Sequence, residues 1–118
     1  MTGIFTKLKV WQLSHELTLE IYKITGNFPV AERYGLTAQL RRAAVAVPTN
    51  IAEGNARVHK REYLQYCGIA RASIAEVEYL LRLGLDLGFI EPKVYSALSE
   101  GYTQVGRMLQ GLINSLSA

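Results

Sequence analysis

The sequence predicts an all-α fold, an antiparallel up-down-up-down four-helix bundle with left-handed packing. Apolar residues recur at helical spacing along four long segments, and no segment shows the alternation typical of a strand. The connections after the second and third segments look short, which favours antiparallel neighbours. A chain of 118 residues can bury about two-thirds of its unfolded surface in one core. We therefore expect a single domain over residues 1–118.

The first helix is predicted at about residues 7–25. Val10, Leu17 and Ile24 repeat every seven residues on one face, and a Gly-Asn-Phe-Pro turn follows the helix. A strip beside this face is rich in aromatic residues and includes Trp11 and Tyr22. This strip is either a wide edge of the core or a contact between subunits, because Trp and Tyr are enriched at interfaces.

The second helix, at about residues 34–55, is apolar on two opposite faces. One face carries the stripe Leu36, Leu40, Ala43, Val47 and Ile51. The other face consists of the smaller side chains Ala38, Val45, Pro48 and Ala52. A helix with two apolar faces needs two neighbours. We expect one neighbour to be its own bundle and the other to be a second copy of the chain, because small residues allow close approach.

Pro48 lies inside this second helix. A proline removes one helical hydrogen bond, here to the carbonyl of Ala44, at a cost of about 3 kcal/mol in a regular helix. We favour one continuous, kinked helix over two helices broken at Pro48, because the apolar stripe keeps its phase across the proline. We therefore expect another interaction to compensate for the hydrogen bond that Pro48 removes.

The third and fourth helices are predicted at about residues 60–87 and 91–116. The third has apolar columns at a seven-residue spacing, typical of a left-handed bundle. Gly88 suits a helix end and Pro92 suits the first turn of the next helix. The single cysteine, Cys67, lies on an apolar column, so we expect a buried structural thiol in a reducing cytoplasm.

Few residues are available for catalysis. Asp86 is the single aspartate, the two histidines are His15 and His59, and no phosphate-binding or dinucleotide-binding glycine motif occurs. His59 and Glu62 have metal-ligand spacing, but the paired Glu-x-x-His motifs of di-metal bundles are missing. We expect no enzymatic activity, cofactor, metal or small-molecule substrate. With neither a signal pattern nor a long apolar run, we expect a cytoplasmic protein with no membrane partner.

The positive charge is concentrated in the middle of the chain. The net charge is +3, yet residues 33–61 contain six basic residues and one acidic residue. In an antiparallel bundle, one end gathers the basic residues Lys7, Lys9, Arg57, Lys60 and Arg61, opposed by Glu53 and Glu62. Arg41 and Arg42 lie about 24 Å of helix away from Arg57. These seven residues are the candidate nucleic-acid contacts; the alternative is that they only keep the protein soluble.

Several longer motifs are more specific in combination than alone. They are Leu8-Lys9-Val10-Trp11, Phe28-Pro29, Tyr34-Gly35-Leu36, Gln39-Leu40-Arg41-Arg42-Ala43-Ala44-Val45, Pro48-Thr49-Asn50-Ile51-Ala52-Glu53-Gly54 and Ala70-Arg71-Ala72-Ser73-Ile74-Ala75-Glu76-Val77-Glu78. With these motifs the chain resembles, over nearly its whole length, the four-helix-bundle proteins encoded in intervening sequences of bacterial 23S ribosomal RNA genes. Ala46 and Ala72 replace the serine and glycine common in that family.

The resemblance implies a ring-shaped assembly, a homopentamer, with no known catalytic activity and an association with RNA or other nucleic acid. The candidate subunit-interface residues are Trp11, Tyr22, Ala38, Val45, Pro48 and Ala52. The leading hypothesis is a non-enzymatic homo-oligomer that contacts nucleic acid through basic residues with little sequence readout. The alternative is a self-assembling scaffold or protein-interaction adaptor with no nucleic-acid role.

Overall fold

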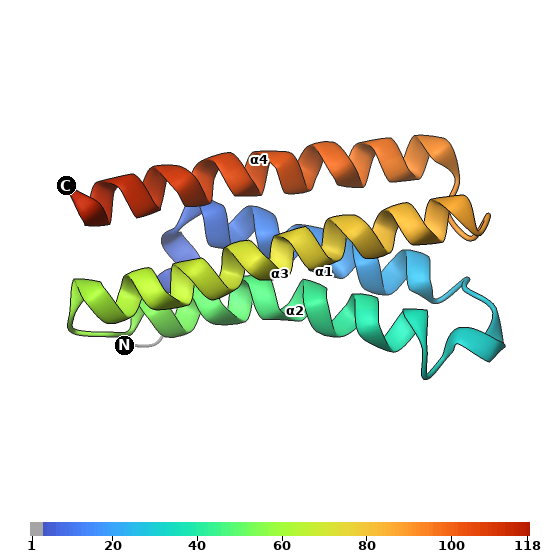
Figure 1. Ribbon diagram of the computed structural model, residues 1–118, viewed down its shortest axis with the longest axis horizontal. Coiled ribbons are helices and arrows are strands. Elements are labelled where there is room, and N and C mark those ends of the chain that lie inside the picture. Colours follow the sequence, from blue (N-terminus) through green and yellow to red (C-terminus); the bar gives the residue numbers. More distant parts are fainter. Residues whose placement is uncertain (1–3) are drawn as a thin grey trace.

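Four long helices dominate the computed structural model, which describes residues 4–118 (Figure 1). They are α1 (Lys9–Thr25), α2 (Leu36–Asn55), α3 (Lys60–Asp86) and α4 (Pro92–Ser117), with two short 3-10 helices, η1 (Phe5–Lys7) and η2 (Val30–Glu32). No strand occurs among the described residues, and the molecule measures 43 × 22 × 20 Å. The predicted all-α class with four helices is confirmed.

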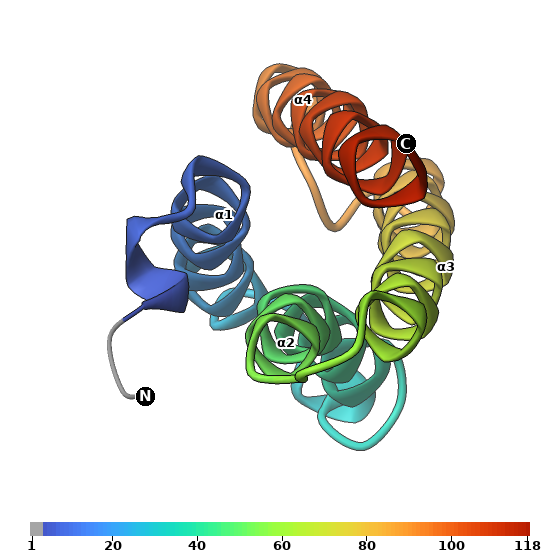
Figure 2. The ribbon, with the colours of Figure 1, turned by 90° about the vertical axis from the view of Figure 1, so that its left-hand side faces the viewer.

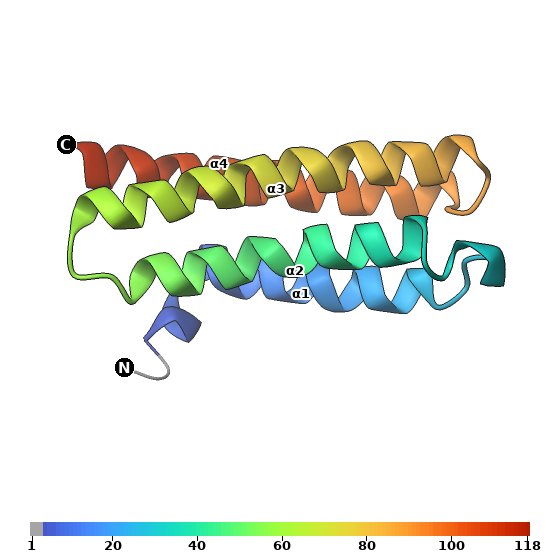
Figure 3. The ribbon, with the colours of Figure 1, turned by 60° about the horizontal axis from the view of Figure 1, so that its bottom comes forward.

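The helices follow one another around the bundle, and α4 closes the circuit against α1 (Figure 2). Thr18 of α1 contacts Ala44 of α2, whereas Thr25, seven residues further along α1, contacts Arg41. Residue numbers rise along one helix as they fall along the other, so α1 and α2 are antiparallel. Figure 3 shows the chain reversing direction at each connection.

The helix starts differ by up to two residues from the predicted ones. Helix α2 begins at Leu36 rather than near residue 34, because the Glu32 carboxylate of η2 accepts the Leu36 N–H at 3.0 Å and so caps the helix. Helix α1 begins at Lys9 because Leu8 has an extended backbone that separates it from η1. Lys7, predicted in the first helix, therefore belongs to η1.

The core is built from the predicted apolar stripes. Leu40, Val47 and Ile51 of α2 are completely buried, and Cys67 of α3 is also buried, as its position on an apolar column predicts. Burial raises the pKa of the Cys67 thiol. No helix within residues 4–118 is both long enough and apolar enough to cross a membrane.

Helix α2 runs without interruption through Pro48, which confirms the prediction of one continuous helix. The Ala44 carbonyl, which loses its helical donor to the proline, lies 3.2 Å from the Thr18 hydroxyl of α1. That hydroxyl is also 2.8 Å from the Ser14 carbonyl, so its proton is shared between the two acceptors. Helix α1 therefore supplies the compensation that the proline requires.

Two aromatic rings close the end of the bundle that holds the α1–α2 and α3–α4 connections. Phe28 follows α1 and is buried, and its ring centroid lies 5.6 Å from that of Phe89, which precedes α4. Gly88, just after α3, has a φ of 80°, a conformation that glycine adopts without steric cost. The turn after α3 therefore depends on this glycine, as the sequence predicts.

Candidate functional site

The five basic residues predicted at one end of the bundle lie at that end, where α1 and α3 begin and α2 ends. Figure 2 views the bundle from this end. All five side chains are exposed: Lys7, Lys9, Arg57, Lys60 and Arg61. We call this set the basic end.

The basic end carries a surplus of positive charge, because its five cations are opposed by two exposed carboxylates, those of Glu53 near the end of α2 and Glu62 in the first turn of α3. Lys60 and Arg61 lie in the first turn of α3, and Lys9 in that of α1, where the helix dipole already contributes partial positive charge. Within the described residues, the one ion pair joins Arg82 to Asp86 on the outer part of α3. A polyanion approaching the basic end therefore meets a net positive surface whose cations form no ion pair among the described residues.

Arg57 is held in place by an aromatic residue that the sequence did not identify. Its Nη2 donates a hydrogen bond of 2.6 Å to the Tyr66 hydroxyl, and its guanidinium carbon lies 4.8 Å from the centre of the Tyr66 ring. Beside it, Asn55 donates to the Tyr63 hydroxyl at 3.2 Å. Burial raises the pKa of Tyr63, and this hydrogen bond opposes the rise. The sequence did not predict the Arg57–Tyr66 contact, because the two residues are nine positions apart and a turn separates them.

Arg41 and Arg42 lie on α2, away from the basic end, as the helical distance predicts. Arg41 is half-buried: its Nε donates to the Thr25 hydroxyl at 2.8 Å, and its Nη2 donates to the Tyr22 carbonyl at 3.2 Å. Its guanidinium also lies 4.6 Å from the centre of the Tyr22 ring. Arg42 is exposed. The structure therefore separates these two arginines from the other five candidates.

A second feature is an apolar groove of about 450 Å³ between α1 and α2. It is lined by Phe5, Trp11, His15, Thr18, Val45, Pro48, Thr49, Ala52 and Glu53. We call it the α1–α2 groove. Four of the six candidate interface residues lie in it, namely Trp11, Val45, Pro48 and Ala52. Two separate sequence patterns, the aromatic strip and the small-residue face, therefore meet at one surface.

The Trp11 ring is clasped between two other rings at one side of the α1–α2 groove. It packs edge-on against Phe5 at a centroid distance of 5.1 Å and stacks on His15 at 4.8 Å. The sequence did not identify Phe5, because it precedes the predicted first helix. Val45 is 38% exposed, whereas Pro48 is buried within the protomer. One wall of the groove is thus formed by packed aromatic rings and apolar side chains.

The remaining two candidate interface residues lie outside the α1–α2 groove. Tyr22, 44% exposed, supports Arg41, and Ala38 is half-buried on the first turn of α2. Among residues 4–118, no three His, Cys, Asp or Glu side chains come close enough together to hold a metal ion. The chemistry that this surface offers is attraction of anions and burial of apolar area.

Comparison with known proteins places this geometry in context. The model of the family described as 23S rRNA-intervening sequence protein matches residues 6–111. Among solved structures, the chain resembles a protein of unknown function from the S23 ribosomal protein family of Bacteroides thetaiotaomicron VPI-5482. The TM-score is 0.79 at 22% sequence identity, covering 88% of this chain and 97% of that chain, so the likeness shows a shared fold. No curated protein matches the chain.

Proposed function

This chain belongs to the family of 23S rRNA-intervening sequence proteins, and we propose that it is a non-enzymatic homo-oligomer that binds RNA through its basic end. The observation that carries the proposal is the set of five exposed cations that form no ion pair among the described residues. They come from η1, from the starts of α1 and α3, and from the connection that follows α2. The closely spaced phosphates of RNA are ligands that such a surface attracts.

The basic end supports contact with the RNA backbone rather than with base edges. The aromatic residues Tyr63 and Tyr66 near the start of α3 are half-buried and hydrogen-bonded to Asn55 and Arg57, and Phe5, which lines a pocket with Arg57, packs edge-on against Trp11. These contacts hold the rings within the protomer and disfavour their use as stacking platforms, which single-strand binding proteins use to hold bases. We therefore expect affinity that depends on salt and little on sequence.

The α1–α2 groove supports the oligomeric part of the proposal. Its apolar wall leaves Val45 and Trp11 partly exposed in the protomer, and a second copy of the chain would cover them. A ring of protomers, five in number as the family resemblance implies, would repeat the basic end around one rim. Repetition turns a local charge surplus into a continuous positive surface.

The RNA-binding part is tested with the double variant Lys60→Glu and Arg61→Glu. Both side chains are exposed in the first turn of α3, so the fold should be retained. We expect the affinity for a labelled single-stranded RNA, followed by fluorescence anisotropy between about 50 and 300 mM salt, to fall at least about tenfold. The log–log salt slope should flatten by up to about 1.4, because two phosphate contacts are lost.

A matched control is the double variant Lys23→Glu and Lys93→Glu, which changes the net charge equally but near the opposite end of the bundle. We expect it to lower the affinity much less. Equal losses in both variants, or an absence of wild-type binding at low salt, would refute the basic end as an RNA-binding surface.

The second candidate function is a self-assembling scaffold, favoured by the α1–α2 groove alone. It predicts the same oligomer but no bound nucleic acid. A native preparation with a protein-like ratio of absorbance at 260 and 280 nm, together with salt-independent anisotropy, would support it over the RNA-binding proposal.

A further inference from the structure

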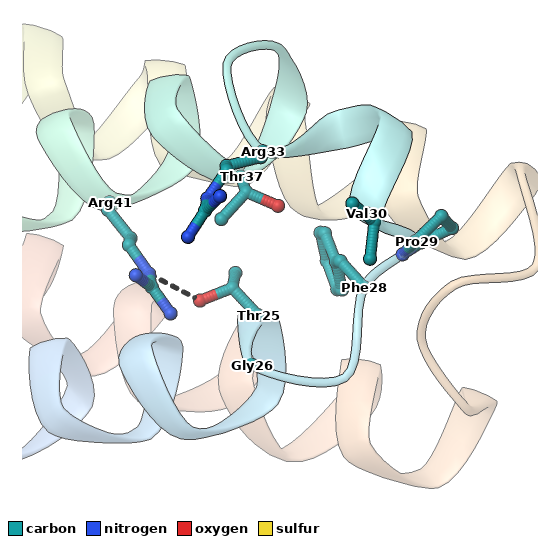
Figure 4. Close-up of a pocket in the computed structure, with 8 residues that line it drawn as sticks. All are labelled: Thr25, Gly26, Phe28, Pro29, Val30, Arg33, Thr37 and Arg41. Carbon is teal, nitrogen blue, oxygen red and sulfur yellow. Dashed lines mark hydrogen bonds between the residues drawn. The ribbon is translucent and has the colours of Figure 1, made fainter.

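A second pocket, of about 350 Å³, lies near the end of the bundle opposite the basic end. It is lined by Thr25, Gly26, Phe28, Pro29, Val30, Arg33, Thr37 and Arg41 (Figure 4). Its residues come from the end of α1, the α1–α2 connection and the start of α2. The pocket volume is within the range typical of sites for small molecules.

Two arginine side chains extend into this pocket from the same wall of the fold. Figure 4 shows the Arg33 and Arg41 side chains directed into the space beside the Thr25 hydroxyl. Arg41 is fixed by its hydrogen bonds to Thr25 and to the Tyr22 carbonyl, and by the Tyr22 ring beneath it. These contacts use Nε and Nη2, which leaves the Nη1 donors without a partner among the described residues. Arg41 is therefore pre-organised, which lowers the entropic cost of binding, whereas Arg33 is exposed, with its guanidinium carbon 5.9 Å from the centre of the Tyr34 ring.

The pocket contains two cations and no acidic residue. The nearest acid in sequence is Glu32, whose Oε1 atom accepts the N–H of Leu36 at the start of α2 and does not line the pocket. Two guanidinium groups that share a partly enclosed space repel each other, and a bound anion would relieve that repulsion. Thr37 lies beside Arg33, and Thr25 faces them from the end of α1, where its hydroxyl donates to the Ile21 carbonyl and accepts from Arg41.

The opposite wall is apolar. Phe28 is buried, whereas Val30 is 86% exposed and stands at the pocket with Pro29 beside it. Figure 4 shows these three residues together on one side of the pocket. A ligand that fills the pocket would therefore carry an anionic group next to an apolar or planar part.

We infer that this pocket binds a phosphate monoester, with the phosphate on Arg33 and Arg41 and the attached ring system against Val30 and Pro29. Guanidinium groups bind phosphate through paired, charge-assisted hydrogen bonds, which favours phosphate over a single-point anion contact. Such a group occurs on a free mononucleotide and on the 5′ end of an RNA. The site is separate from the basic end and does not depend on the proposed function.

Calorimetric titration of the full chain with adenosine 5′-monophosphate tests the inference. We expect binding by the wild type that falls at least about tenfold in Arg33→Gln and in Arg41→Gln. Arg33→Gln is the more informative variant, because Arg33 is exposed and its loss should not disturb the fold. The matched control Arg42→Gln removes an exposed neighbouring charge that does not line the pocket, and should bind as the wild type does.

The apolar wall is tested with two further ligands. Inorganic phosphate should bind more weakly than adenosine 5′-monophosphate, and Val30→Ala should reduce this difference while leaving phosphate binding unchanged. Adenosine, which has no phosphate, should not bind. Absence of nucleotide binding, or equal affinity in Arg33→Gln and Arg42→Gln, would overturn the inference.

The source of the phosphate is distinguished in the Lys60→Glu and Arg61→Glu background, where the basic end is weakened. Preference for a 5′-phosphorylated RNA over its 5′-hydroxyl counterpart would identify an RNA end as a ligand, and equal affinity would identify the free nucleotide. Nucleotide binding that survives in this background, with RNA affinity lost, would support both sites independently. Loss of nucleotide binding there would contradict a separate pocket.

Discussion

Thr18 supports α2 at the point where Pro48 removes a helical hydrogen bond. It is buried, and its hydroxyl contacts the Ala44 carbonyl that Pro48 leaves without a helical donor. Beside it lies the Tyr102 hydroxyl, which is buried and makes no hydrogen bond within the described residues. Burial raises the pKa of Tyr102. The Thr18 hydroxyl thus contacts the backbone of α2, whereas the Tyr102 hydroxyl has no hydrogen-bond partner among the described residues.

Thr18→Val should lower the free energy of unfolding by about 1–3 kcal/mol, because it leaves a buried carbonyl without a donor. Urea denaturation followed by circular dichroism measures the change. The control Thr18→Ser keeps the hydroxyl and should retain more of the stability. Tyr102→Phe removes a hydroxyl that has no partner, so it should be neutral or stabilising. A Thr18→Val variant as stable as the wild type would contradict this account of Pro48.

The sequence predicted that Pro48 needs compensation, but not which residue supplies it. Thr18 and Ala44 are 26 residues apart, and their contact depends on the register between α1 and α2. Local periodicity specifies which face of each helix is buried, but it does not specify how far one helix slides along the other.

At the scale of the helices, close packing between α2 and α3 depends on Gly54. A Cβ atom at this position would lie 2.8 Å from the Cβ of Tyr66 and 2.9 Å from the Cδ1 of Tyr63. The Tyr66 Cβ is attached to the α3 backbone and cannot swing away. The glycine therefore allows the end of α2 to approach the start of α3, which positions Arg57 against Tyr66.

Gly54→Ala should destabilise the fold by about 1–3 kcal/mol through overpacking. Helix propensity alone predicts a gain of about 1 kcal/mol, so the sign of the change separates the two effects. The matched control is Gly68→Ala in α3, where an added Cβ meets no atom within 4 Å and propensity should prevail. Thermal or urea unfolding of both variants measures the difference, and a stabilised Gly54→Ala variant would contradict the packing described for α2 and α3.

The helix boundaries show where local sequence reasoning is sufficient. The stop signals after α1 and α3 act locally, through the Gly-Asn-Phe-Pro turn and Gly88. The start of α2 was misplaced by two residues, because the N-cap is Gly35 and the first helical N–H is bound by the Glu32 carboxylate of the preceding 3-10 helix, a contact that the apolar periodicity does not indicate.

For the whole molecule, buried groups with raised pKa values predict a loss of stability at alkaline pH. Burial raises the pKa of Cys67, Tyr63 and Tyr102 above their ordinary values of 9.0 for the thiol and 10.0 for the phenols. The folded chain therefore holds these protons more tightly than the unfolded chain does. As pH rises through the ordinary values, the unfolded chain loses its protons first, and unfolding becomes more favourable.

We expect the free energy of unfolding to be nearly constant from about pH 7 to 8 and to fall between about pH 9 and 11. Urea denaturation over this pH range measures the trend. Tyr102→Phe should show a smaller decline, since it removes one of the three groups. Stability that stays level to about pH 11 would show that the three groups titrate equally in the folded and unfolded chains.

The candidate surfaces were predictable to different extents. The gathering of Lys7, Lys9, Arg57, Lys60 and Arg61 at one end follows from helix order and alternating direction, both of which the sequence predicts. The pocket around Arg33 and Arg41 does not, because a folded connection and two helix ends form it together. The α1–α2 groove lies between these cases, since sequence patterns predicted its walls but not the contribution of Phe5.

The central claim is that the α1–α2 groove joins subunits and so repeats the basic end around an oligomer. Sedimentation velocity tests it directly on three proteins: the wild type, Val45→Glu and Val58→Glu. The last variant is the control, because it makes the same valine-to-glutamate change at another site. Val45 lines the groove, whereas Val58 is 91% exposed and lies outside it. We expect wild type and Val58→Glu to sediment as a multiple of the 13.1 kDa protomer, and Val45→Glu as a smaller species with unchanged helix content. A monomeric wild type, or a Val45→Glu variant of wild-type mass, would contradict the claim.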